Sequence, residues 1–269
     1  MLFLFLLACL CVRGADETCT NPIIYAEPEV VRDGEGEPVA SYRKPDVSGV
    51  FSVQSPQTSD EFNASELGLQ WQWQANPVDS WFSFAEGGKL SLTAVPRAPD
   101  AKNLWDVPNL LLQKLPATAF TVSTLVDTSH LLTGERSGLL IMGQDYSYIG
   151  VVKTQKGARL VHVTCHDAPN GTAEKEAKAV NTKSRKVYLR ISVVSMLGDV
   201  ICNFSYSFDG KRFRWMDDIF VAKPGKWIGA KVGLFALGPT NASTRGHADY
   251  DWFRFALQQQ PSQTPARVR

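Results

Sequence analysis

Paired carboxylates are the first residues in this chain whose spacing could do chemistry. Asp249 and Asp251 are two positions apart in a strand-like run, so both should point from the same face of a strand. Such a pair could serve as acid and nucleophile in the hydrolysis of a sugar–sugar bond, or it could form edge hydrogen bonds or bind calcium. We expect the structural role here. Glu174 and Glu176 fall in a polar segment, and we expect them to be solvated.

Histidine and cysteine residues offer a second kind of chemistry. One stretch is rich in metal-ligating types, namely His162, Cys165, His166 and Asp167. Its spacing matches no zinc motif, so we expect His162 to be an ordinary sheet residue. His130 and His247 are isolated from this stretch and from each other.

Aromatic residues are the more informative set, because sugars present apolar C–H faces that suit flat rings with amides beside them. The candidates for carbohydrate binding are Trp71, Trp73, Trp81, Tyr146 and Tyr148. Glutamine and asparagine residues interleave with the tryptophans. Tryptophan in an all-β chain usually packs in the core, so burial and ligand contact both remain open.

Composition and charge narrow the function classes. The chain has 269 residues, 44% hydrophobic, with 28 basic and 27 acidic residues and a net charge of +1. This balance gives no long-range attraction to nucleic acid or to an anionic membrane, so we expect neither as a partner. The hydrophobic content is enough for a sizeable core and excludes disorder as the main state.

The ends of the chain differ from its middle. The apolar run at residues 2–12 is about half the length of a membrane-spanning helix, which needs about 20 residues. Residues 1–15 therefore resemble a secretory signal, and we expect a secreted protein, extracellular or periplasmic. Residues 16–58 are expected to form a leader and linker, and residues 258–269 a polar, disordered tail.

Residues 59–257 carry many short runs with a period of two, separated by turn signals such as Asp209-Gly210. Only residues 172–180 could form a helix, and a long hairpin loop fits them as well. The pattern predicts an all-β fold, an antiparallel β-sandwich or jelly roll. Cys165 and Cys202 lie in strand-like runs, and a disulfide between them and isolated thiols are both open.

Several motifs occur in order along this middle region. They are SDEFN at residues 59–63, LGLQWQW at 67–73, NLLLQK at 109–114, GQDYSYIGV at 143–151 and DYDWFR at 249–254. Together they resemble the C-terminal concanavalin A-like β-sandwich of glycoside hydrolase family 43, which contains β-xylosidases and α-L-arabinofuranosidases. The resemblance covers residues 59–256 and implies a concanavalin A-like sandwich.

The resemblance also bears on activity. In that family a five-bladed propeller before the sandwich carries three catalytic carboxylates. Residues 21–32 resemble the first propeller strand, with Glu27 at the position of the base aspartate, and residues 33–46 resemble the segment that enters the sandwich. The acid and the carboxylate that tunes it have no counterpart. The catalytic propeller is therefore expected to be missing, and one carboxylate cannot carry out a two-carboxylate reaction.

Three functions follow from the resemblance. The first is a secreted, non-catalytic accessory sandwich that binds xylan- or arabinan-type polysaccharide. The second is a fragment of an active β-xylosidase or α-L-arabinofuranosidase, and the third is a structural remnant without a ligand. The resemblance implies no cofactor except a structural calcium ion where the first and last strands meet, with Asp251 and the backbone near Glu61 as its candidate ligands.

Overall fold

The computed structural model describes residues 55–85 and 87–257, together with the strand positions of four short strands before them. The chain divides into two units, Met1–Gln54 and Ser55–Arg269. In the first unit, β1 (Thr18–Cys19) pairs with β4 (Tyr42–Arg43), and β2 (Ile24–Tyr25) pairs with β3 (Pro38–Val39). The predictions for the signal, for the Glu27 side chain and for the polar tail lie outside the described residues.

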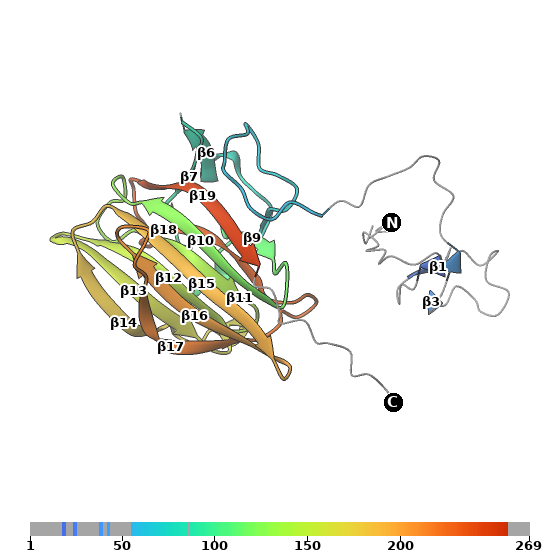
Figure 1. Ribbon diagram of the computed structural model, residues 1–269. Helices are drawn as coiled ribbons and strands as arrows, with labels where there is room; N and C mark the ends of the chain where they lie inside the picture. Colours follow the sequence, from blue (N-terminus) through green and yellow to red (C-terminus); the bar gives the residue numbers. More distant parts are fainter. Residues whose placement is uncertain are drawn as a thin grey trace. The chain divides into compact units, whose positions relative to one another are not determined.

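The second unit is a sandwich of two sheets (Figure 1). The seven-stranded sheet has the order β17 (Arg214–Ala222), β16 (Asp199–Ser207), β15 (Lys186–Met196), β10 (Ala119–Asp127), β19 (His247–Leu257), β7 (Lys89–Thr93) and β6 (Phe82–Ala85). The eight-stranded sheet has the order β14 (Lys175–Thr182), β13 (Gly157–Cys165), β12 (Tyr146–Thr154), β11 (Arg136–Met142), β18 (Lys231–Gly238), β9 (Leu111–Lys114) and β5 (Gln72–Trp73). β8 (Val95–Pro96) is its eighth strand and runs parallel to β18, whereas the other pairs are antiparallel. The predicted all-β sandwich is confirmed.

Helical structure in the described residues is limited to three short 3₁₀ turns, η1 (Asp79–Trp81), η2 (Leu104–Asp106) and η3 (Ala168–Asn170). None of the helices in this part of the chain could cross a membrane. The helix considered for residues 172–180 is wrong, because Lys175–Thr182 forms the edge strand β14. This strand is largely exposed, so its sequence lacks the apolar alternation that marks other strands.

The main core lies between the two sheets and follows directly from the period-two pattern. In β15 the fully buried residues are Val187, Leu189, Ile191 and Val193, and the residues between them point to the other face. Tyr250 of β19 crosses this core with its hydroxyl 2.6 Å from Ser137 Oγ and 3.1 Å from the carbonyl oxygens of Gly138 and Phe235. This buried hydroxyl therefore links the seven-stranded sheet to β11 and β18 of the other sheet.

A second core covers the outer face of the eight-stranded sheet. Segments that include η2 and η3 lie on this face and bury Leu104, Val107 and Ala168 against Tyr146 and Phe235. The eight-stranded sheet is therefore apolar on both faces. The outer face of the seven-stranded sheet meets solvent, and it carries polar side chains and, toward β17, exposed apolar ones.

Candidate functional site

The early tryptophans lie in and beside the core. Trp71 is 8% exposed, its Nε1 donates a hydrogen bond to the Asp60 carboxylate at 2.8 Å, and its ring contacts Phe253 edge to face at 4.9 Å. Trp81 is equally buried and contacts the half-buried Trp73 at 5.4 Å. Trp71 and Trp81 therefore offer no exposed ring face for a sugar, and Trp73 offers part of one.

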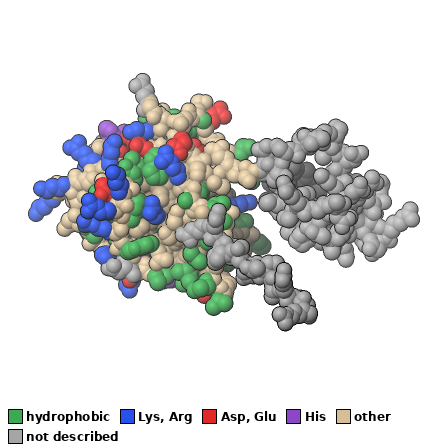
Figure 2. Space-filling model, viewed as in Figure 1, with side chains coloured by type: hydrophobic (Ala, Val, Ile, Leu, Met, Phe, Trp, Pro, Cys, Tyr) green, Lys and Arg blue, Asp and Glu red, His purple; other side chains and the backbone are tan. Residues whose placement is uncertain are grey.

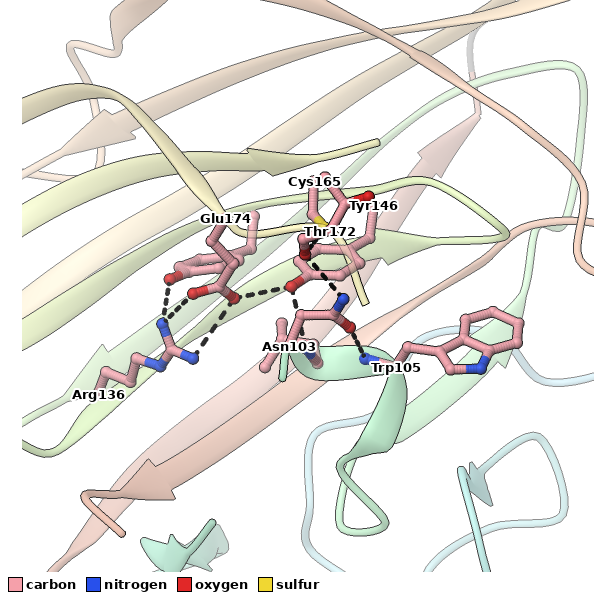
Figure 3. Close-up of polar contacts among 9 residues, drawn as sticks. Asn103, Trp105, Arg136, Tyr146, Cys165, Thr172 and Glu174 are labelled. Carbon is pink, nitrogen blue, oxygen red and sulfur yellow. Dashed lines mark hydrogen bonds and ion pairs between the residues drawn. The ribbon is translucent and has the colours of Figure 1, made fainter. Parts of the chain in front are cut away.

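Tyr146 and Tyr148 lie on β12 beneath the segments that cover the eight-stranded sheet, with 0% and 1% of their surface exposed. Figure 3 shows their neighbourhood. The Tyr146 hydroxyl donates to Glu174 at 2.8 Å and accepts from the backbone N–H of Leu104 at 2.9 Å. Arg136 Nη1 donates to the Tyr148 hydroxyl at 2.8 Å and to Glu174 at 2.7 Å. Both rings are thus interior residues rather than exposed sugar-stacking platforms.

The electrostatics of this network favour a structural role. Burial raises the pKa of both phenols, and the neighbouring Glu174 charge raises the pKa of Tyr146 further, so both hydroxyls stay protonated. Glu174, which the sequence led us to expect in solvent, is paired with Arg136 and only 17% exposed. The expectation for Glu174 was wrong because its partner lies on β11, which is distant in the sequence.

A buried asparagine fixes the two covering segments to one another. Asn103 Oδ1 accepts from the backbone N–H of Trp105 at 2.8 Å, and its Nδ2 donates to the carbonyl oxygens of Ala168 and Thr172 at 2.9 and 3.0 Å (Figure 3). Thr172 also accepts from the Cys165 thiol at 3.2 Å. These contacts hold the covering segments closed over the sheet.

The carboxylate pair of β19 is engaged by neighbouring side chains. A bulge at Asp251 separates it from Asp249, because Tyr250 pairs with Val126 and Trp252 with Leu125. Asp249 accepts a hydrogen bond from the Ser91 hydroxyl, and Asp251 lies 3.2 Å from Lys89 Nζ. A calcium ion at Asp251 would therefore have to compete with the Lys89 ammonium group.

The backbone near Glu61 is the other candidate ligand for this calcium ion. The Glu61 side chain forms a bidentate ion pair with Arg254, with both distances 2.6 Å. The first and last strands of the sandwich do meet here, since Asp60 and Phe253 exchange backbone hydrogen bonds of 2.7 Å. Direct protein contacts thus join these segments.

The histidine-rich stretch does not converge on one point. His162 is buried with Nε2 at 2.9 Å from Ser147 Oγ, whereas His166 is mostly exposed and contacts Asp145 at 2.8 Å. Cys165 and Cys202 are buried free thiols on different sheets. The disulfide alternative is therefore wrong.

A basic hollow lies at one end of the eight-stranded sheet, although the net charge of the chain is close to zero. It measures about 780 Å³, and its lining includes Lys153, Lys156, Arg159 and Lys183. Lysine and arginine side chains gather on the left of Figure 2, the side on which Figure 1 labels β13 and β14. Arg159 is paired with Glu176, whereas the other three cations have no ion pair within the part of the chain that the structure describes. The hollow suits an anionic group.

The outer face of the seven-stranded sheet combines exposed and half-buried aromatic rings with polar side chains. We call this surface the polar face and define it by Thr121, Ser123, Tyr188, Arg190, Ser192, Asn203, Ser205, Trp215, Trp252 and Arg254. Strand register places them in rows, because residues on neighbouring strands are direct partners. One row runs Trp215, Ser205, Arg190, Ser123 and Arg254, in which Ser205 is fully buried and the other four side chains reach solvent.

The rings of the polar face are held in place by their neighbours. Trp252 is half-buried, lies 6.2 Å from the Tyr188 ring and packs beneath the Arg254 guanidinium at 4.4 Å. Trp215 is 56% exposed at the far edge of the row. Arg190 donates to Ser123 Oγ at 3.0 Å. The arrangement offers stacking surfaces with hydrogen-bonding groups between them.

These residues are not among the candidates predicted from the sequence, although the sequence carries a signal for them. The even-numbered positions of 187–194 alternate with a purely apolar set, and therefore had to face away from the core. Trp252 and Arg254 likewise alternate with Phe253 and Phe255. Clustering of tryptophans in the sequence drew attention to 71–81 instead.

Comparison with known proteins gives one family match and several relatives. Residues 59–256 match the model described as Beta xylosidase C-terminal Concanavalin A-like domain. A Beta-xylosidase of Formosa agariphila is 29% identical over 253 residues, which cover 87% of this chain and 40% of that protein. The Non-reducing end alpha-L-arabinofuranosidase BoGH43B of Bacteroides ovatus is 25% identical, over 85% of this chain and 42% of that protein. The chain thus spans about two-fifths of the length of these relatives.

Solved structures show the same fold. A bifunctional GH43-CE protein of Bacteroides eggerthii matches with a TM-score of 0.67 and 24% identity, over 84% of this chain and 29% of that one. The GH43 protein BlXynB of Bacillus licheniformis matches with a TM-score of 0.63 and 20% identity, over 85% of this chain and 45% of that one. These matches support the sandwich architecture described above.

Proposed function

Because the chain belongs to the family of β-xylosidase C-terminal concanavalin A-like domains, we propose that it is a non-catalytic accessory sandwich that binds xylan- or arabinan-type polysaccharide. The polar face is the proposed binding surface. The observation that carries the proposal is the row of hydroxyl and guanidinium groups that begins at the exposed Trp215 and ends at Arg254 beside the half-buried Trp252.

The dimensions and chemistry of the polar face suit an extended chain of sugars. Five strands take part, and with neighbouring strands 4.7–4.9 Å apart the row is about 19 Å long. Trp215 and Trp252 provide apolar surfaces for C–H faces, while Arg190 and Asn203 provide donors and an acceptor for sugar hydroxyls. The names of the relatives, a β-xylosidase and an α-L-arabinofuranosidase, support xylan- and arabinan-type ligands as the first to test.

Two observations support the absence of catalysis within the sandwich. Hydrolysis of a glycosidic bond needs one carboxylate to donate a proton and a second to attack or to activate water. Asp249 and Asp251, the pair with suitable spacing, are engaged by Ser91 and Lys89. Glu174, the other partly buried candidate, is neutralised by Arg136.

We also propose that the protein is exported from the cell, because the apolar run at residues 2–12 is followed by small residues, as in a secretory signal. Expression of the full chain with cell fractionation tests this: recovery outside the cytoplasm with a shortened N-terminus is expected. Retention of an intact N-terminus in the cytoplasm would contradict export.

Binding is tested by pull-down of the full chain with insoluble xylan and arabinan. We expect retention on at least one of them, and at least a tenfold loss of affinity when Trp215→Ala and Trp252→Ala are combined. Trp227→Ala is the matched control, because Trp227 is 94% exposed and lies outside the polar face. Absence of retention, or an equal loss in the control, would contradict the assignment.

Catalysis is tested separately with nitrophenyl xyloside and nitrophenyl arabinofuranoside. We expect no turnover by the 269-residue chain. Turnover that survives Glu174→Gln and Asp249→Asn but is lost in Glu27→Gln would assign activity to the first unit and refute the non-catalytic role.

A further inference from the structure

Two histidines that are far apart in the sequence meet beside an aspartate at one end of the seven-stranded sheet. His130 lies in the segment after β10, His247 begins β19, and Asp249 follows two residues later. One ligand atom from each residue lies within 4.8 Å of the other two. His247 Nε2 is 3.7 Å from Asp249 Oδ1, and the two imidazole rings are 4.5 Å apart. The two histidines are far apart in the sequence, as noted above, but the fold brings them into contact.

A buried carboxylate holds the two histidine-bearing segments together. Glu135 is 1% exposed, and its two oxygens accept the backbone N–H groups of Leu132 at 2.6 Å and Gly246 at 2.7 Å. The backbone N–H of His247 also donates to the His130 carbonyl oxygen at 3.3 Å. The positions of both histidines are therefore fixed by contacts that do not involve their side chains.

Glycine at position 246 makes this close approach possible. A Cβ atom there would lie 2.2 Å from the His130 carbonyl oxygen and 2.3 Å from a Glu135 oxygen, well inside contact distance. Only glycine allows the segment before His247 to pack this tightly against the segment that carries His130.

The aspartate and the local charge suit a cation. The Ser91 hydroxyl donates to Asp249 Oδ1 and so orients the carboxylate beside His247. Lys89 donates a hydrogen bond to Asp251, which is the largest cause of its raised pKa, and the nearby charges of Asp127 and Asp249 raise it further. Lys186 is the second lysine here, 3.8 Å from Asp127. Three carboxylates face two lysines, which leaves one negative charge.

We propose that His130, His247 and Asp249 bind a divalent transition-metal ion of the Zn²⁺ class. Two imidazoles and one carboxylate are typical ligands for this class, whereas Ca²⁺ prefers six to eight oxygen ligands. A tetrahedral ion with bonds of about 2.0–2.1 Å keeps its ligand atoms about 3.3 Å apart, close to the His247–Asp249 separation. The exposed His130 ring only has to turn about its side-chain torsions to complete the set, and a fourth position remains for water.

Calorimetric titration of the untagged full chain with ZnCl₂ tests the proposal. We expect one Zn²⁺ per chain, with binding weakened at least tenfold in His130→Ala and in Asp249→Asn. His130 is exposed, so its replacement should leave the fold intact. His166→Ala is the matched control, because His166 is an exposed histidine of the other sheet that contacts Asp145 instead.

Electron paramagnetic resonance of the Cu²⁺-loaded chain gives an independent readout of the ligands. Coupling to two imidazole nitrogens is expected in the wild type and in His166→Ala, and coupling to one in His130→Ala. The assignment is refuted by the absence of stoichiometric uptake, by uptake and coupling unchanged in His130→Ala, or by loss of binding in His166→Ala.

Discussion

Acidification should destabilise the sandwich well before its carboxylates titrate, because His162 is buried as a neutral imidazole. The ring lies between the two sheets with no exposed surface and contacts Phe204 at 4.5 Å. Ser147 Oγ uses its single proton on the Val163 carbonyl oxygen, so it must accept from His162 Nε2–H. Protonation would then place a second N–H on Nδ1, which has no hydrogen-bond partner among the described residues.

The size of the effect follows from the shift in pKa. Burial lowers the pKa of His162 from 6.5 to about 4. Between these values the unfolded chain binds the proton and the folded chain does not, so stability falls as the pH is lowered through this window. One pKa unit corresponds to about 1.4 kcal/mol, and the free energy of unfolding should therefore fall by about 2 kcal/mol between pH 7 and pH 5. Carboxylates with lowered pKa, such as Asp127 and Asp145, lose their contribution only at lower pH.

Urea denaturation followed by tryptophan fluorescence at pH 5, 6 and 7 measures this loss. His162→Gln should flatten the profile between pH 5 and pH 7, whatever its stability at pH 7. His166→Gln, which removes an exposed histidine, is the comparison variant. An identical slope in wild type and His162→Gln would refute the reasoning.

Three further perturbations test the packing. Tyr250→Phe removes the buried hydroxyl that links the two sheets. It should lower the free energy of unfolding by about 1–3 kcal/mol. A loss below about 0.5 kcal/mol in urea denaturation would contradict that link. Glu174→Gln leaves the Arg136 charge without its carboxylate. It should lower the free energy of unfolding by about 2–3 kcal/mol. Unchanged stability in thermal or urea unfolding would contradict this expectation. Burial raises the pKa of Cys202 to about 12, so a thiol reagent should modify this residue slowly in the native protein and quickly once urea is added. Mass spectrometry locates the modified cysteine. Fast modification of Cys202 in native buffer would be inconsistent with its burial.

The strands were predictable because half-buried strands alternate. Val187 to Val193 show this plainly, and the structure follows the pattern position by position. The edge strand β14 was not predictable, because its side chains are exposed or only half-buried and its polar sequence also fits a helix or a loop. The motifs at 59–73 and 249–254 identified the correct sandwich family, since they occur in the right order.

The candidate sites were less predictable, because residue type does not reveal which face a ring occupies. Tyr146 and Tyr148 alternate on one strand as expected, yet the covering segments bury that face. His130 and His247 approach one another only through the pairing of β10 with β19 and the Glu135 contacts. Long-range register of this kind is set by the folded sheet and has no local signature in the sequence.

The indole N–H signals of the seven tryptophans offer the most direct test of where polysaccharide binds. In ¹H–¹⁵N spectra of the full chain titrated with xylohexaose or arabinohexaose, we expect the signals of Trp215 and Trp252 to shift in a saturable manner. The signals of the buried Trp71 and Trp81 and of Trp227, outside the polar face, should stay in place. Saturable shifts confined to Trp227, or no shift with either sugar, would contradict the account.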